Sequence, residues 1–255
     1  MPTALITGST AGIGRAFAEA LAARRYDLVL VARDLTRLGA VAEELSSRYT
    51  VHCDVLSADL AEPAAVRAVE NRIADTSPDL LVNNAGFGLG SRFLDTPVEE
   101  EERLLDVLVR AVLRLTRAAL PSMVARGSGA VVNVSSVAGF APYGTYGAAK
   151  AWVTSFTEAV ANEVAGTGVR VVAVCPGFVR TEFHQRSGAW PKGLPGWMWL
   201  TSEDVVSATL RHLDAGRTSP VLVPTLRYRL VAGAARHLPR PLVRSVSRSL
   251  RMRRR

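Results

Sequence analysis

Seven short apolar runs, separated by longer segments of helical periodicity, constrain the fold of this chain most strongly. The runs are rich in Val, Ile and Leu and are of strand length. Strands that are apolar throughout are typical of a parallel sheet covered by helices on both faces. Right-handed crossovers then give a doubly wound α/β sheet. The predicted strands occupy residues 3–7, 27–32, 49–55, 79–84, 129–136, 168–176 and 220–224.

The predicted helices lie between these runs, mainly at residues 13–25, 36–48, 64–74, 103–125 and 150–166. The stretch "SGAWPKGLPGWMWL" at 187–200 breaks the alternation with three Gly, two Pro and three Trp. We therefore expect a lid at about residues 184–200. A length of 255 residues suits a single domain of this class. We predict one domain over residues 1–225, including the lid, followed by a C-terminal extension over 226–255.

A glycine-rich turn follows the first predicted strand, where "TGSTAGIGRA" places Gly8, Gly12 and Gly14 before a helix. Glycines here allow a tight turn and a close approach of the backbone to a pyrophosphate at the positive end of that helix. The spacing GxxxGxG differs from the commoner GxGxxG. An ordinary loop is the alternative interpretation of this turn.

The end of the second predicted strand bears on cofactor choice. An acid at this point would bind the adenosine ribose and select NAD, but "VLVARD" has Ala32 there and Arg33 just after it. A guanidinium suits the 2′-phosphate of NADP. The sequence therefore favours NADP, with a solvated Arg33 as the alternative.

Cysteine and histidine usage indicates neither a disulfide framework nor a metal site. Cys53 and Cys175 lie inside predicted strands, which fits reduced core thiols. The histidines lack metal-ligand spacing; they are His52, His184, His212 and His237. We find no pattern of a signal peptide or a membrane span and expect a cytoplasmic protein.

Five motifs stand in the order typical of one enzyme family. They are "TGSTAGIG" at 7–14, "NNAG" at 83–86, "NVSS" at 133–136, "YGAAK" at 146–150 and "PGFVRT" at 176–181. Over roughly residues 3–223 the chain thus resembles the short-chain dehydrogenase/reductase family. This resemblance implies a single-domain Rossmann fold that transfers hydride between NAD(P) and a carbonyl or an alcohol. It also implies a homodimer or homotetramer formed through the long helices beside the active site.

The resemblance further implies which residues bind the cofactor. In the glycine turn, Ser9, Thr10 and Ile13 accompany the three glycines. Asp59 is expected to hydrogen-bond the adenine, with Leu60 beside it. A segment that stabilises the sheet and lines the adenosine ribose is implied at Asn83, Ala85 and Gly86. A segment that holds the nicotinamide and the phosphates is implied at Pro176, Gly177, Val179 and Thr181.

The predicted catalytic pair is Tyr146 and Lys150. Reduction of a carbonyl by hydride needs a proton donor at the carbonyl oxygen. Tyrosine has an ordinary pKa of about 10, and a nearby ammonium is expected to lower it. Residues four apart on a helix share a face, which selects Tyr146, whereas Tyr143 precedes Gly144 and is expected in a loop. The chain has only two lysines, Lys150 and Lys192, against 29 arginines.

The family pattern selects Ser136 to orient the substrate oxygen, with Ser135 as its structural neighbour. A turn or a helix cap is the alternative for this Ser pair. The connection from Ser136 to Tyr146 is about three residues shorter than is common in the family. A larger departure is Leu108, which stands where the family usually has an asparagine whose backbone holds a water of the proton relay.

Aromatic residues in the predicted lid suggest an apolar carbonyl substrate, such as a lipid-like, terpenoid or aromatic ketone. These residues are Trp190, Trp197 and Trp199. Packing of the lid onto the body of the protein is an equal alternative.

The net charge of +8 is concentrated at the C-terminus, since residues 226–255 hold ten arginines and no acid. Arg244, Arg248 and Arg251 would share one helical face, so the tail suits weak contact with an anionic membrane surface. A solvated end or a subunit contact is the alternative, and nothing in the tail indicates nucleic-acid binding.

Taken together, these features predict an NADP(H)-dependent reductase of apolar ketones or aldehydes. Two rival interpretations remain. One is a weakly catalytic or non-catalytic NADP-binding protein of the same fold, which Leu108 suggests. The other is a membrane-surface protein whose tail determines its role.

Overall fold

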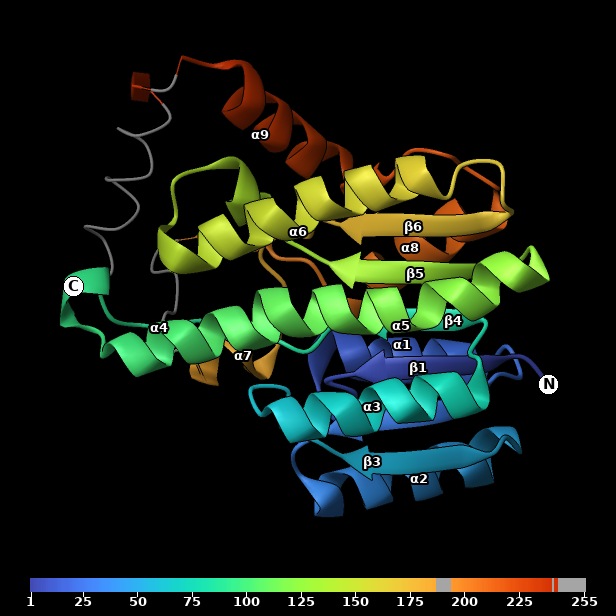
Figure 1. The fold of residues 1–255 in the computed structure, drawn as a ribbon. Coiled ribbons are helices and arrows are strands. Elements are labelled where there is room, and N and C mark those ends of the chain that lie inside the picture. Colours follow the sequence, from blue (N-terminus) through green and yellow to red (C-terminus); the bar gives the residue numbers. More distant parts are fainter. Residues whose placement is uncertain (187–193, 240, 243–255) are drawn as a thin grey trace.

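Seven parallel strands form one sheet in the computed structural model, which describes residues 1–186, 194–239 and 241–242. The strand order is β3-β2-β1-β4-β5-β6-β7, so the predicted doubly wound sheet is confirmed (Figure 1). The order reverses between β1 and β4, the place where ligands bind in such sheets. The strands are β1 Thr3–Thr7, β2 Asp27–Ala32, β3 Cys53–Ser57, β4 Leu80–Asn83, β5 Gly129–Val134, β6 Val169–Val174 and β7 Val221–Leu222.

Helices cover both faces of the sheet (Figure 1). The helices α1, α2 and α8 pack on one face, while α3, α5 and α6 pack on the other. Their bounds are α1 Gly12–Ala22, α2 Leu35–Tyr49, α3 Pro63–Thr76, α4 Val98–Leu105, α5 Ala111–Arg126, α6 Gly144–Glu163, α7 Glu182–Arg186, α8 Ser202–Asp214 and α9 Leu226–His237. Short 3-10 turns occupy Phe93–Asp95, Val137–Phe140 and Gly196–Met198.

The central strand β1 explains why the strands are apolar throughout. Successive side chains of a strand point to opposite faces of the sheet. Ala4 and Ile6 belong to the core under α1 and α2, whereas Leu5 belongs to the core under α3 and α5. Because all three side chains are fully buried, neither face of the sheet tolerates a polar residue here.

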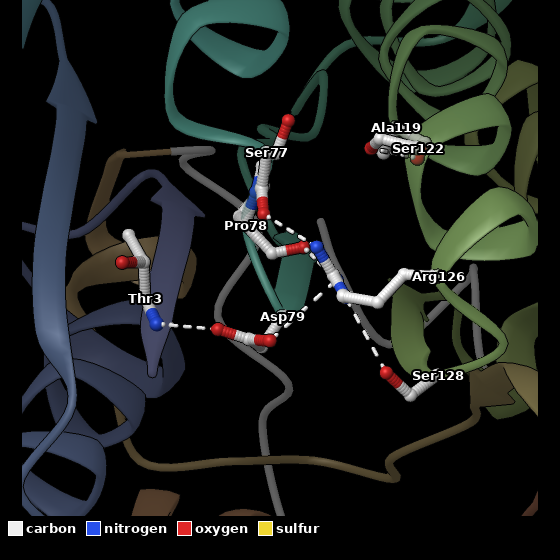
Figure 2. Close-up of polar contacts among 8 residues, drawn as sticks. All are labelled: Thr3, Ser77, Pro78, Asp79, Ala119, Ser122, Arg126 and Ser128. Atoms are coloured by element: carbon white, nitrogen blue, oxygen red, sulfur yellow. Dashed lines mark hydrogen bonds and ion pairs between the residues drawn. The ribbon is translucent and has the colours of Figure 1, made fainter. Parts of the chain in front are cut away.

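A cluster of polar contacts ties the chain together at the amino ends of the strands (Figure 2). The Asp79 carboxylate accepts a hydrogen bond from the backbone N of Thr3 at 2.8 Å and lies 3.5 Å from Nη2 of Arg126. The Arg126 guanidinium also donates to the carbonyl oxygens of Ser77 and Pro78. These contacts join β1, the entry to β4 and the end of α5, at the sheet edge opposite the carboxyl ends of the strands.

The predicted helix over 103–125 is interrupted by a π-helical turn. Helix α4 passes into a π turn at Asp106–Arg110, and α5 follows at Ala111. Leu108 lies in this turn and its side chain is fully buried. A π turn inserts one residue into an α-helix and is often found at functional sites.

The start of the predicted C-terminal extension packs into the core. Tyr228 and Ala232 of α9 are 1% and 4% exposed, and Tyr228 belongs to the cluster beneath α1 and α8. Within the described residues, no helix is long and apolar enough to cross a membrane. The predicted tail contact rests on Arg244, Arg248 and Arg251, which lie outside the described residues, as does Trp190 of the predicted lid.

Candidate active site

The glycine turn joins β1 to α1 in a conformation that requires its glycines. Gly8 and Gly12 have φ values of +67° and +54°, in the region that favours glycine. A Cβ on Gly14 would collide with the carbonyl oxygen of Gly8. At the N-terminus of α1, the N-cap Ala11 offers no side chain to its amide groups. These amides and the close-packed backbone fit a pyrophosphate.

Asn84 and Thr7 hold the glycine turn in place, and sequence reasoning did not single out either residue. The Asn84 Nδ2 donates to the carbonyl oxygens of Thr7 at 2.9 Å and Gly8 at 3.2 Å. In return, the Thr7 hydroxyl accepts hydrogen bonds from the backbone N of Asn84 and of Ala85, both at 3.0 Å. The turn after β1 and the turn after β4 are therefore fixed to each other.

The other predicted residues of the turn differ in exposure. Ser9 is fully buried and its hydroxyl lies 3.4 Å from the carbonyl oxygen of Val31, whereas Thr10 and Ile13 are partly exposed. The Thr10 carbonyl oxygen accepts a hydrogen bond from Arg37 at 3.3 Å. Arg37 also forms a bidentate ion pair with Glu182, at 3.2 and 2.9 Å. Arg37 thus connects the glycine turn to the first residue of α7.

The adenosine end of the predicted site contains an exposed arginine and a paired acid. Arg33 is exposed immediately after β2, and within the described residues no carboxylate pairs with it. Asp59 accepts a hydrogen bond from Arg103 at 2.5 Å and another from the backbone N of Ala61 at 3.1 Å. Leu60 beside it is buried. Both Asp59 carboxylate oxygens therefore already have partners.

Asn83 points into the core and forms a buried amide ladder. Its Nδ2 donates to the Asn133 Oδ1 at 2.9 Å and to the Thr116 hydroxyl at 3.1 Å. The Asn133 Nδ2 donates in turn to the Thr157 hydroxyl at 3.0 Å. The ladder links β4, α5, β5 and α6, which agrees with the sheet-stabilising role that the family resemblance implies for this segment.

The predicted catalytic side chains come from β5 and α6. Tyr146 and Lys150 lie on the first turns of α6, and the Lys150 Nζ is 5.8 Å from the centroid of the Tyr146 ring. Ser136 follows β5, and its hydroxyl lies close enough to the Tyr146 hydroxyl to lower the pKa of that group. Tyr143 is the N-cap of α6, outside the helix as predicted. The structure thus brings Ser136, Tyr146 and Lys150 together.

Two neighbouring contacts fix Lys150, the predicted catalytic lysine. The Nζ of Lys150, a residue only 5% exposed, donates to the carbonyl oxygen of Val134 at 2.7 Å. The buried Ser135 hydroxyl donates to the Lys150 carbonyl oxygen at 2.7 Å. Ser135 therefore anchors the helix turn that carries Lys150, while Ser136 faces Tyr146.

The pKa relationship of this pair differs from the prediction. Burial raises the pKa of Tyr146 to about 12, and the hydrogen bond with Ser136 opposes this shift only in part. Burial also lowers the pKa of Lys150 to about 8. The expected lowering of the Tyr146 pKa by Lys150 is therefore wrong for this structure, because desolvation of the hydroxyl dominates. Tyr146 is protonated near neutral pH and able to donate.

The segment after β6 holds four predicted residues, of which Thr181 lies beside the glycine turn and Pro176 beside the loop that carries Ser136. The Pro176 carbonyl oxygen accepts from the backbone N of Val137, next to Ser136, at 3.0 Å. Thr181 lies against Gly12, whose added Cβ would be 2.8 Å from the Thr181 Cγ2. Val179 is buried and pairs with Leu200. The fourth residue, Gly177, packs against Tyr228.

Aromatic side chains surround the catalytic tyrosine and the end of the predicted lid. The Phe183 ring of α7, a residue that sequence reasoning did not select, lies 5.7 Å from the Tyr146 ring. Trp199 packs 6.0 Å from Phe178, whereas Trp197 is 63% exposed. Trp199 therefore supports the packing alternative, and Phe183 supplies an aromatic contact to Tyr146.

The described residues contain no group of three or more His, Cys, Asp or Glu side chains that would hold a metal ion. Cys53 and Cys175 are free thiols. Burial raises the pKa of both thiols, which favours their protonated form.

A glycine turn at the switch point of a doubly wound sheet defines a dinucleotide-binding protein of the Rossmann class. Comparison with known proteins narrows this class. The short chain dehydrogenase family model matches residues 2–192. The chain therefore belongs to the short-chain dehydrogenase/reductase family of oxidoreductases.

Relatives within this family differ in substrate. Sulfoacetaldehyde reductase 2 of Chromohalobacter salexigens is 40% identical over 186 residues, which cover 70% of this chain and 73% of the relative. A short-chain dehydrogenase from Sphingobium yanoikuyae in complex with NADPH has a TM-score of 0.84 at 39% identity, covering 92% of this chain and 93% of the other. A bulky-bulky ketone specific alcohol dehydrogenase from Comamonas testosteroni has a TM-score of 0.80 at 33% identity, with 92% of each chain covered.

Proposed function

We propose that this protein is an NADP(H)-dependent oxidoreductase that interconverts a carbonyl and an alcohol, acting mainly as a reductase of apolar ketones or aldehydes. The observation that carries the proposal is the arrangement of Ser136, Tyr146 and Lys150 beside the glycine turn. When bound, the nicotinamide supplies the hydride. The protein residues then have to orient the carbonyl and deliver a proton to its oxygen.

Tyr146 is the proposed proton donor. Its pKa of about 12 keeps the hydroxyl protonated at neutral pH, as a proton donor for carbonyl reduction must be. The Ser136 hydroxyl acts on the pKa of the same group and would orient the substrate oxygen toward it. Lys150 is held by the Val134 carbonyl oxygen, so its ammonium stands at a fixed place behind the tyrosine.

The preference for NADP(H) rests on Arg33 and Ala32. The exposed Arg33 guanidinium follows β2 directly, at the position where a 2′-phosphate would lie, and Ala32 removes the acid that would bind the ribose hydroxyls of NAD. The relative from Sphingobium yanoikuyae binds NADPH, which supports the same choice. The glycine turn would hold the pyrophosphate through backbone amides.

The proposed substrate class rests on the surroundings of Tyr146. Phe183 packs beside the catalytic ring, and the relative from Comamonas testosteroni acts on bulky ketones. An apolar substrate would gain from contact with such aromatic surfaces. The sulfoacetaldehyde relative offers the contrasting case of a small charged aldehyde.

A carbonyl panel followed by NADPH absorbance tests the proposal. It should include bulky aryl ketones, long-chain aldehydes and small charged aldehydes, with Tyr146→Phe as the control. We expect turnover by the wild type and a loss of at least about 100-fold in the variant, which keeps the ring but lacks the proton donor. Equal NADPH oxidation by both proteins across the panel would overturn the catalytic proposal and favour a non-catalytic NADP-binding protein.

We also propose a homo-oligomer formed through α5 and α6. Leu113 and Val124 of α5 are 42% and 39% exposed, and Trp152 and Phe156 of α6 stack at 4.7 Å between ring centroids. Partly exposed apolar side chains on long helices suit a subunit contact. Sedimentation equilibrium measures the assembly, and a strict monomer would contradict this proposal.

A further inference from the structure

Tyr228 of α9 packs against the glycine of the segment proposed to hold the nicotinamide. Its side chain is among the largest that are fully buried. A Cβ on Gly177 would fall inside the Tyr228 ring, so the ring and the Gly177 backbone are in direct contact. The tyrosine lies about 50 residues further along the chain, outside the five family motifs.

The Tyr228 hydroxyl joins the segment before the predicted lid to the end of that lid. It accepts a hydrogen bond from the backbone N of Phe178 at 3.0 Å and donates one to the carbonyl oxygen of Met198 at 2.8 Å. Burial raises the pKa of this hydroxyl, so both hydrogen bonds persist at neutral pH. A single buried hydroxyl therefore fixes the start and the end of the 178–198 segment to the same helix.

The neighbouring residue of α9 reinforces this junction. Arg227 donates to the Trp199 carbonyl oxygen at 3.3 Å. At the other end of this junction, the Pro176 carbonyl oxygen accepts a hydrogen bond from the backbone N of Val137, the residue after Ser136. Continuous contacts thus run from α9 through residues 176–178 to the loop that carries Ser136.

We propose that Tyr228 is a positioning residue for hydride transfer, because it sets the place of residues 176–178 relative to Ser136 and Tyr146. The inference rests on the proposed function and on the family resemblance, which implies that this segment holds the nicotinamide. Rates of transfer depend steeply on the alignment of the reacting groups. The cofactor's adenosine end would be held elsewhere, by the glycine turn and Arg33, so its affinity should depend little on Tyr228.

Tyr228→Phe is the sharpest test, since it keeps the buried ring and removes only the hydroxyl. We expect kcat to fall about tenfold while the Kd for NADPH changes less than about twofold. The primary deuterium isotope effect, with NADPH labelled at the transferred position, should rise as hydride transfer becomes rate-limiting. The Phe178 amide should exchange faster with deuterated solvent.

Tyr49→Phe is the matched control, because the Tyr49 hydroxyl donates a hydrogen bond to the Glu19 carboxylate at 3.3 Å, far from the proposed catalytic residues. It should leave kcat and the isotope effect unchanged. Arg227→Ala loosens the same junction without touching the buried ring and serves as a second variant should Tyr228→Phe fold poorly. Like Tyr228→Phe, it should lower kcat.

A readout without turnover separates this inference from the proposed function. The fluorescence of bound NADPH reports the surroundings of its reduced ring, and we expect Tyr228→Phe, but not Tyr49→Phe, to change it. The wild type could reduce no carbonyl of the panel while Tyr228→Phe still changes the fluorescence of bound NADPH. This result would overturn the proposed function but retain the role of Tyr228 in positioning the nicotinamide. The inference would be overturned if Tyr228→Phe left both the NADPH fluorescence and kcat unchanged. Faster exchange of the Phe178 amide as the single effect would not rescue it.

Discussion

The Leu108 side chain packs directly against Gly86, the glycine beside the proposed catalytic lysine. A Cβ on Gly86 would lie 2.9 Å from the Leu108 Cδ2 and 3.9 Å from the Lys150 Nζ. The family usually has an asparagine at this position, and its proposed contribution is a backbone kink that holds a water. Here the π turn at Asp106–Arg110 is present with leucine. The backbone distortion therefore does not depend on an asparagine side chain.

We predict that Leu108→Asn will not raise kcat by more than about twofold. The fully buried amide should lower the free energy of unfolding by about 2–4 kcal/mol, because it replaces apolar packing with an unpaired polar group. Urea unfolding and steady-state kinetics measure the two effects. Leu115→Asn, at another buried position of the same core, provides the control for the stability loss. A tenfold gain in kcat would mean that leucine weakens the proton relay.

Lys150 should make stability depend on pH in a defined direction. Burial lowers its pKa to about 8 in the folded protein, against roughly 10.4 in an unfolded chain. Below about pH 8 both states are protonated and the cost of burying the ammonium is present in full. Between about pH 8 and 10 the folded state has released a proton that the unfolded state still binds, so the free energy of unfolding rises.

We expect the free energy of unfolding to rise by about 2–3 kcal/mol between about pH 8 and 10. Urea unfolding of the wild type and of Lys150→Met at each pH measures this rise. The comparison removes the contributions of the other titrating groups, which both proteins share. A difference between the two proteins that stays flat over this range would contradict the lowered pKa.

Arg33→Ala should weaken NADPH binding by about 10- to 100-fold, through loss of a charge-assisted contact to the 2′-phosphate. The affinity for NADH, which lacks this phosphate, should change less than about twofold. Fluorescence titration with both cofactors measures the selectivity. Arg67→Ala removes another exposed arginine, on α3, and should affect neither cofactor. Equal losses for NADPH and NADH on Arg33→Ala would argue against the phosphate contact.

Gly177→Ala should destabilise the protein by about 1–3 kcal/mol, because the added methyl group meets the Tyr228 ring. In a Tyr228→Ala background this penalty should largely vanish, which a double-mutant cycle in urea detects. Gly233 lies on α9, the helix of Tyr228, and an added Cβ there would have nothing within 4 Å. Gly233→Ala should therefore leave the free energy of unfolding unchanged or raise it. Additive effects of the two substitutions would show that the contact carries no energy.

The sequence alone was sufficient to predict the sheet, because fully buried parallel strands leave continuous apolar runs. It also predicted the spacing of Tyr146 and Lys150, since four residues make one helical turn. The π turn left no signal, because the apolar periodicity continues through Leu108. Contacts such as those of Arg37 with Glu182, or Tyr228 with Phe178, join residues far apart in the chain, and no local pattern encodes them.

A second limit of prediction from the sequence is the choice between two adjacent residues of the same type. The motif "NNAG" drew attention to Asn83, but the structure gives the contact with the glycine turn to Asn84. The pKa of Tyr146 was a third limit, because spacing identifies a neighbouring charge but not the depth at which the hydroxyl is buried.

The polar cluster around Arg126 and Asp79 has a consequence for how this protein can diversify. It ties the amino ends of the strands together with contacts that involve none of the proposed active-site residues. Side chains at the opposite edge, such as Phe183 and Trp197, can therefore be exchanged at little cost to folding. A library confined to that edge should yield folded proteins with altered substrate range, which makes the chain a practical starting point for directed evolution.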